Sequence, residues 1–159
     1  NIKIYELPNG GSITLFSMVP FILVSFRHGV KWGLFTGFVN SLLQMLLGFY
    51  APPAPGLLPL VGMILLDYVL AFGVMGIAGL GRGKPHGIFW GSVLGGAARF
   101  VVHYISGITI YKILAPTEIF GTVFDNPALY SLIYNGSYVG IDLLYAPLKT
   151  YMTGADLRR

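Results

Sequence analysis

Long apolar stretches separated by short polar turns run along most of the chain. Within them, small and polar residues recur at steps of three and four, which is typical of helices packed against other protein. Pro20 is expected to bend the first stretch, which is also short for a bilayer crossing. The pattern predicts five helical spans, at about Ile13–Phe26, Val30–Tyr50, Leu57–Leu80, Ile88–Ile110 and Ala128–Met152. The longest intervening stretches are predicted to be loops: Asn1–Ser12, Ala51–Gly56 and Lys112–Pro127.

The composition indicates that lipid is the solvent for most of this chain. Hydrophobic residues make up 55% of it and charged residues 10%, with a mean hydropathy of +0.72, whereas ordinary soluble domains are about a quarter charged. Each crossing takes about 20 residues. We therefore expect residues 1–159 to form one domain, an all-α polytopic membrane protein without a separate soluble domain. The chain has no cysteine, which excludes disulfides, thiolate metal sites and a cysteine nucleophile, and we expect no metal and no cofactor.

Lysine and arginine gather in alternate turns and at the C-terminus. Arg27 and Lys31 follow the first span, and Arg82 and Lys84 follow the third. Basic residues in short loops mark the cytoplasmic side, so we predict that these turns are cytoplasmic and that the net charge of +4 does not indicate nucleic-acid binding. The chain then begins outside, without an initiator methionine or a signal sequence. We therefore expect that a leading helix is missing and that the parent bundle has six helices.

The fourth predicted span carries Arg99 and His103 one helical turn apart within an apolar run. A charge in hydrocarbon costs at least a few kcal/mol, so this arginine must face other protein or a water-filled cavity. Asp142 approaches from the last span at a similar depth, and we expect Arg99 and Asp142 to form a structural ion pair. That pairing would leave Asp67, in the third span, without a fixed cation. A cationic ligand is one way to supply it.

Three polar residues are predicted to converge below the external surface. At 1.5 Å per helical residue, Asp67, His103 and Asn135 each lie roughly 10 to 15 Å deep. Tyrosines surround that level, and Tyr68 and Tyr138 are too deep to belong to an interfacial aromatic belt. An acid, an imidazole, an amide and aromatic rings suit a flat heteroaromatic cation, through ion pairing, hydrogen bonds and cation–π contact.

These residues resemble the ThiT family, the thiamin-binding S components of energy-coupling factor (ECF) vitamin transporters. The resemblance covers nearly the whole chain. It is carried by Tyr5–Thr14, Met18–Gly29, the Leu66-Asp-Tyr68 stretch through Gly79, Arg99–Gly107 and Leu129–Gly136.

The resemblance implies a thiamin pocket that opens outward beneath two external loops of a protein in the bacterial plasma membrane. It also implies a partner, the ECF module of one coupling membrane protein and two ATPases. The family's leading helix, which docks on the coupling subunit, is absent here, so docking residues cannot be assigned. Tyr111 stands where the family can carry a tryptophan, and the acid is the shorter aspartate. The implied substrate-binding residues are Asp67, Tyr68, His103, Tyr111, Tyr130 and Asn135.

Three other functions fit parts of this pattern. Related S components bind riboflavin, biotin or other vitamins on similar folds. An intramembrane hydrolase would use two aspartates and a histidine, but the sequence has no G-x-S-x-G, no H-E-x-x-H and no repeated glycine-framed catalytic aspartate, so we expect no enzyme. A purely structural subunit would leave Asp67 unpaired in the membrane, which its desolvation cost disfavours.

Overall fold

A computed structural model describes the backbone of residues 2–6, 12–15, 18–52, 55–111, 117–119 and 121–153. Helices dominate these residues, so the all-α prediction is confirmed. The separate elements are β1 (Ile2–Glu6), β2 (Ser12–Leu15), α1 (Val19–His28), α2 (Val30–Gly48), α5 (Gly87–Thr109), β3 (Thr117–Ile119), β4 (Thr122–Phe124) and α6 (Pro127–Thr153). A further run of helical residues is assembled from α3 (Leu57–Met63), the π-helical η2 (Ile64–Leu70), α4 (Ala71–Gly73) and the 3-10 segment η3 (Val74–Gly81).

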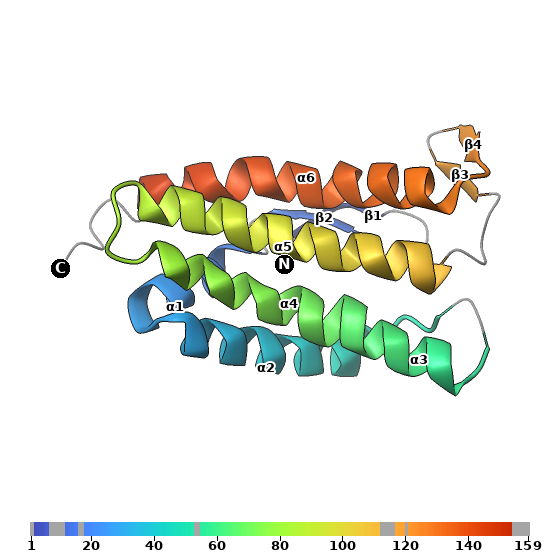
Figure 1. Cartoon of the computed structure of the whole chain (residues 1–159), viewed down its shortest axis with the longest axis horizontal. Coiled ribbons are helices and arrows are strands. Elements are labelled where there is room, and N and C mark those ends of the chain that lie inside the picture. The colour runs from blue at the N-terminus through green and yellow to red at the C-terminus, as the bar shows by residue number, and fades with distance from the viewer. Residues whose placement is uncertain are drawn as a thin grey trace.

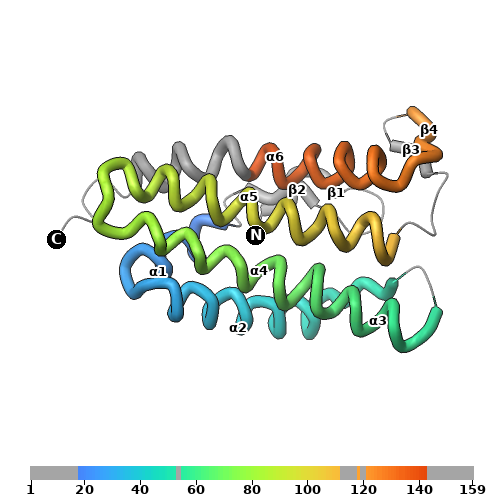
Figure 2. The backbone as a smooth tube through the Cα atoms, in the orientation of Figure 1, coloured from blue at the N-terminus to red at the C-terminus, as the bar shows by residue number. Residues whose placement is uncertain are grey.

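The helices form an elongated bundle in which neighbours run in opposite directions (Figure 1). The run from α3 to η3 lies between α2 on one side and α5 on the other, and α6 packs along α5. The same path is followed by the backbone tube in Figure 2. Asp67, in η2, therefore lies in the helical run that packs against α5, the helix that carries Arg99 and His103.

The start of the chain differs from its prediction. The expected first span, 13–26, is divided between β2 and α1, and α1 has only 10 residues. Ten residues rise about 15 Å, half the thickness of a bilayer core. Pro20 lies in the first turn of α1, where its missing N–H leaves no helical hydrogen bond unmade, so it begins this helix rather than bending it.

Two hairpins replace parts of the predicted loops. β1 pairs with β2 in antiparallel register, from Ile2 opposite Leu15 to Glu6 opposite Ser12. β3 pairs with β4, with Glu118 opposite Val123. The prediction of loops at 1–12 and 112–127 was therefore wrong for these strands, because strands of three to five residues leave little periodic signal. Residues 7–11 and 112–116 lie outside the described residues.

Glycines allow α2 to pack tightly on the next helix. A Cβ atom at Gly37 would collide with the backbone of Phe72, and one at Gly76 would collide with the backbone of Gly33 and Leu34. Side chains are thus excluded from this contact, and the two backbones approach directly.

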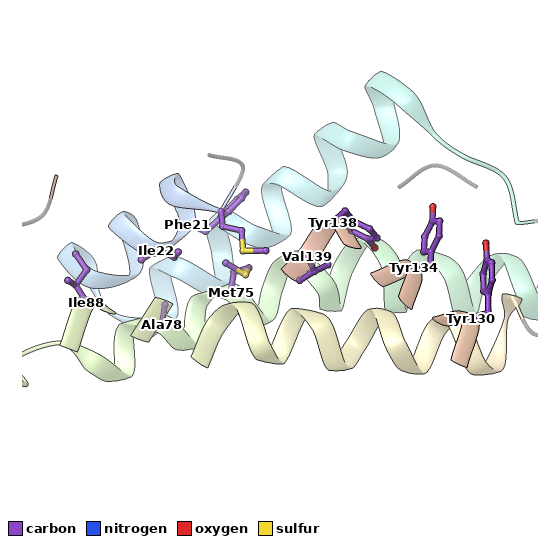
Figure 3. Close-up of a cluster of buried hydrophobic side chains, with 10 residues drawn as sticks. Phe21, Ile22, Met75, Ala78, Ile88, Tyr130, Tyr134, Tyr138 and Val139 are labelled. Carbon is purple, nitrogen blue, oxygen red and sulfur yellow. The ribbon is translucent and has the colours of Figure 1, made fainter. Parts of the chain in front are cut away.

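A cluster of buried apolar side chains links three parts of the bundle. Phe21 and Ile22 of α1 meet Met75 of η3, and Val139 of α6 completes the contact (Figure 3). Three tyrosines of α6 extend this cluster toward the far end of the bundle. The core is therefore apolar toward one end and phenolic toward the other.

Two helical runs in the described residues are both long enough and apolar enough to cross a membrane, Leu57–Gly81 and Gly87–Thr109. The count of five spans thus stays a prediction. Outward-facing side chains are also strongly apolar, with Leu46 82% and Leu47 85% exposed on α2. Such a surface is unfavourable in water and suited to lipid. The fold is that of an all-α membrane protein.

Candidate functional site

Asp67 lies in the π-helical segment η2, where the wider turn interrupts an otherwise tighter helix. Such segments occur frequently at functional sites. Its carboxylate is approached by two side chains of α5: the Ser106 hydroxyl donates to Oδ2 at 2.7 Å, and His103 Nδ1 lies 3.0 Å from Oδ1. Both oxygens of this acid are therefore held by the neighbouring helix.

The hydrogen bonds also determine the tautomer of His103. Arg99 Nε carries a proton and donates to His103 Nε2 at 3.4 Å, so Nε2 must be the accepting nitrogen. Nδ1 then carries the imidazole proton and donates it to Asp67. A neutral histidine thus connects a guanidinium to a carboxylate.

Arg99 is buried, and its guanidinium contacts Phe72 and His103. Its Cζ lies 4.9 Å from the centroid of the Phe72 ring, a cation–π contact, and Nε bonds to His103. Within the described part of the chain, Nη1 is buried without a hydrogen-bond partner. Asp142 is also buried, and its predicted ion pair with Arg99 stays a prediction. The sequence did not predict that Asp67 would have partners within the protein.

Asn135 joins α6 to the same site. Its amide nitrogen donates to the backbone oxygen of His103 at 3.3 Å and to both oxygens of Ser131, at 2.9 Å and 3.0 Å. Its amide oxygen accepts from the Tyr138 hydroxyl at 2.8 Å. Ser131 in turn donates to the backbone oxygen of Tyr104 at 3.1 Å. The structure therefore brings Asp67, His103 and Asn135 together, as their depths predicted.

A row of buried tyrosines leads along α6 to His103. Tyr130 stacks on Tyr134 with centroids 5.6 Å apart, Tyr134 meets Tyr138 edge-on at 5.7 Å, and Tyr138 meets the imidazole edge-on at 5.9 Å. Figure 3 shows Tyr130 and Tyr134 projecting side by side from α6. Tyr134 and Tyr138 were not among the predicted site residues, although the spacing of four residues places all three on one face.

The two remaining predicted residues are Tyr68 and Tyr111. The hydroxyl of Tyr68 accepts from the backbone N–H of Tyr50 at 3.0 Å, and its ring stacks on Phe49 at 5.9 Å. Tyr68 therefore contacts the residues that follow the C-terminal end of α2. Tyr111, just beyond α5, is half-buried; burial, followed by the nearby Asp67 charge, raises the pKa of its phenol above the ordinary value of 10.0. Its hydroxyl stays protonated and can donate a hydrogen bond.

Ser106 is the residue that sequence reasoning missed most clearly. It shares the polar stripe of α5 with Arg99 and His103, at steps of three and four. A serine on such a stripe usually bonds its own helix, as Ser92 does to the backbone oxygen of Ile88. Only the position of η2 shows that Ser106 bonds Asp67 instead. Among the described residues, no group of three or more His, Asp or Glu side chains could hold a metal ion.

Comparisons with known proteins point to one family. The profile of the family described as "Thiamine transporter protein" matches residues 1–155. The chain is 34% identical to the thiamine transporter ThiT of Bacillus subtilis, over 84% of this chain and 70% of that protein. It is 31% identical to the thiamine transporter ThiT of Lacticaseibacillus paracasei, over 76% of this chain, and spans 62% of that protein's length. The chain, with its partly buried acid and its buried histidine and tyrosines between η2, α5 and α6, belongs to the thiamine transporter family ThiT, a family of membrane transport proteins rather than enzymes.

Proposed function

We propose that this chain captures thiamin from outside the cell as the S component of an ECF importer in the bacterial plasma membrane. The proposed site lies between η2, α5 and α6, in a pocket open to the external side. Family membership supports thiamin as the substrate. The residues proposed to contact it are Asp67, Tyr68, His103, Tyr111, Tyr130 and Asn135.

The observation that carries this proposal is the partly buried Asp67 carboxylate, held by two neutral donors between helices of an apolar bundle. Neutral donors stabilise a carboxylate without cancelling its charge. A thiamin molecule carries a positive thiazolium ring and an aminopyrimidine with N–H donors, and either group complements a negative oxygen. In a low-dielectric environment such a contact is stronger than it would be in water.

Aromatic surfaces supply the second part of the proposed recognition. His103 is fixed by Arg99 and Asp67, so its ring has one orientation in which to stack on a flat ligand. The tyrosine row that begins at Tyr130 is buried and prearranged, which reduces the ordering cost of binding. Asn135 uses its amide within the protein, so we propose that it contributes chiefly by holding the His103 backbone.

Calorimetric titration of purified full-length protein with thiamin, riboflavin and biotin tests the proposed substrate. We expect thiamin to bind stoichiometrically with a dissociation constant below about 1 μM, a free energy beyond about −8 kcal/mol, and the other two vitamins not to bind at that concentration. Tight binding of riboflavin or biotin without thiamin would assign the chain to another vitamin. If none of the three binds, capture of thiamin, riboflavin or biotin by this chain is refuted.

Uptake against a gradient requires energy, and we propose that the ECF module supplies it. The 159 residues contain no Walker lysine loop and no internal repeat typical of secondary transporters. Vesicles containing ATP and the full-length protein, with or without the module, separate the alternatives. We expect thiamin accumulation only when the module is present, and uphill accumulation by this chain alone would contradict a capture role.

A further inference from the structure

The end of the bundle opposite the β3–β4 hairpin carries an exposed basic surface. It is formed by the turn between α1 and α2 and by the turn between η3 and α5 (Figure 1). The two turns adjoin, because a Cβ atom at Gly29 in the first turn would lie 3.9 Å from Nη1 of Arg82 in the second. We name this surface the basic end, and its exposed residues are Arg27, His28, Lys31, Arg82, Lys84 and His86.

Close backbone packing holds these turns together. A Cβ atom at Gly79 would lie 2.8 Å from the backbone oxygen of Ser25 and 3.0 Å from the nitrogen of Val30. Gly81 and Gly87 approach each other so closely that a Cβ on either would collide with the other's backbone. Like charges are therefore fixed near one another, which is unfavourable unless anions neutralise them.

The protein itself supplies no acid at this surface within the described residues. The acids whose side chains are described are Asp67, Glu118, Asp125 and Asp142. Asp67 and Asp142 lie within the bundle, and Glu118 and Asp125 lie in and beside the hairpin at the opposite end. The acids of the described residues therefore do not neutralise this surface, which leaves it suited to an external anion.

Both tryptophans of the chain mark the same end. Trp32 follows Lys31 in the first turn of α2 and is 58% exposed, and Trp90 lies in the first turn of α5 and is 63% exposed. Each meets a neighbouring phenylalanine edge-on, Trp32 with Phe35 and Trp90 with Phe89. Exposed tryptophans one helical turn from a basic loop are typical of helix ends that lie where lipid headgroups meet acyl chains.

We propose that the basic end binds anionic phospholipid headgroups in preference to zwitterionic ones. The cations meet the headgroup phosphates and the tryptophan rings lie just beneath them, against the upper acyl chains. An anionic leaflet attracts each nearby lysine or arginine, and the attraction falls within a Debye length. Four such residues on two adjoining turns therefore enrich acidic lipid around this end.

Tryptophan fluorescence tests this proposal directly, because residues 1–159 contain only 2 tryptophans and both lie at the basic end. Any tryptophan outside these residues is replaced by phenylalanine. Full-length protein is reconstituted in vesicles of phosphatidylcholine with a fixed fraction of phosphatidylglycerol, and bromine atoms are placed on the upper acyl carbons of one lipid at a time. At equal mole fraction of brominated lipid, we expect brominated phosphatidylglycerol to quench the tryptophan fluorescence at least about twice as strongly as brominated phosphatidylcholine. The difference should shrink at high salt.

Two double variants provide the matched comparison. Arg82→Gln with Lys84→Gln should remove most of the preference, whereas Arg82→Lys with Lys84→Arg keeps both charges and should retain it. Thiamin titration serves as the folding check, since neither residue contacts the proposed vitamin site. Equal quenching by the two lipids in the unmodified protein would overturn the proposal and would favour an acidic protein surface as the partner. Unchanged preference in the glutamine variant would overturn the assignment to these residues.

Discussion

At the scale of single residues, the site is a directed set of hydrogen bonds around one acid. Arg99 donates to His103, His103 donates to Asp67, and Ser106 donates to the other oxygen of Asp67. These three hydrogen bonds are in place before any ligand arrives, whereas Nη1 of Arg99 has no partner among the described residues. The carboxylate thus has a neutral donor on each oxygen and, among the described residues, no cation in direct contact.

Replacing Asp67 with asparagine keeps its size and removes its charge. We expect thiamin affinity to fall about tenfold to a hundredfold, because an ionic contact in a low-dielectric site becomes a neutral one. Calorimetric titration measures the change. Asp125→Asn is the matched control, because that acid is exposed beside the hairpin, and it should bind as the unmodified chain does. Unchanged affinity in folded Asp67→Asn would remove this carboxylate from the site.

Arg99 has a different expected role, since it is buried on Phe72 and orients the imidazole. Arg99→Ala should cost about 3 kcal/mol of stability, because it opens a cavity and removes the guanidinium contacts with Phe72 and His103. Thermal unfolding in detergent measures this loss. Arg82→Ala, at an exposed position, should leave the melting temperature nearly unchanged. Equal effects of the two substitutions would show that burial of Arg99 contributes nothing to stability.

At the scale of elements, the site depends on how helices approach one another. The contact between α2 and η3 needs glycine, whereas α5 and α6 are joined by side-chain bonds from Ser131 and Asn135 to backbone oxygens. The first contact fixes the helical run that contains η2 and packs against α5, and the second joins α6 to α5. Both must form before Asp67, His103 and Asn135 can meet.

Two glycines in the same helical run test the first contact. Gly76→Ala would drive a methyl group into the backbone of α2, and we expect a loss of about 1 to 3 kcal/mol. Gly73→Ala meets nothing within 4 Å and should be neutral or slightly stabilising, since alanine is the better helix former. Melting temperatures in detergent compare the two variants. A Gly73 variant as unstable as the Gly76 variant would contradict the packing argument.

At the scale of the whole molecule, the two ends of the bundle differ in charge. Basic turns lie at one end, and the hairpin that contains Glu118 lies at the other (Figure 1). This arrangement agrees with the alternation of basic loops along the chain. It predicts that the basic end faces the cytoplasm and that the hairpin faces outward.

Single cysteines test this orientation without background, because the chain has none of its own. In intact cells, a membrane-impermeant thiol reagent should label Val123→Cys, whose position is 59% exposed on β4. It should label Pro85→Cys, in the basic turn, only after the cells are opened. Labelling of Pro85→Cys in intact cells would reverse the orientation and place the proposed vitamin pocket inside.

The sequence alone determined the solvent, the helical class and three of the polar residues that meet, Asp67, His103 and Asn135. A lack of charge in long apolar stretches permits few other folds, and a lone acid, histidine or asparagine at depth must face protein. Local pattern failed at the chain start, because a four-residue strand and a ten-residue helix together resemble one short apolar span. It gave the spacing of Tyr130, Tyr134 and Tyr138 without showing that they stack.

Only the tertiary structure decided which polar groups meet. Ser106 and Ser92 occupy similar positions on one helix, yet one bonds Asp67 and the other its own backbone. Tyr68 follows Asp67 in sequence but faces Phe49, because adjacent helical residues point in different directions. Partners of a polar group depend on the rotation and separation of neighbouring helices. These are fixed by long-range contacts such as Gly76 against α2, which no local stretch of sequence contains.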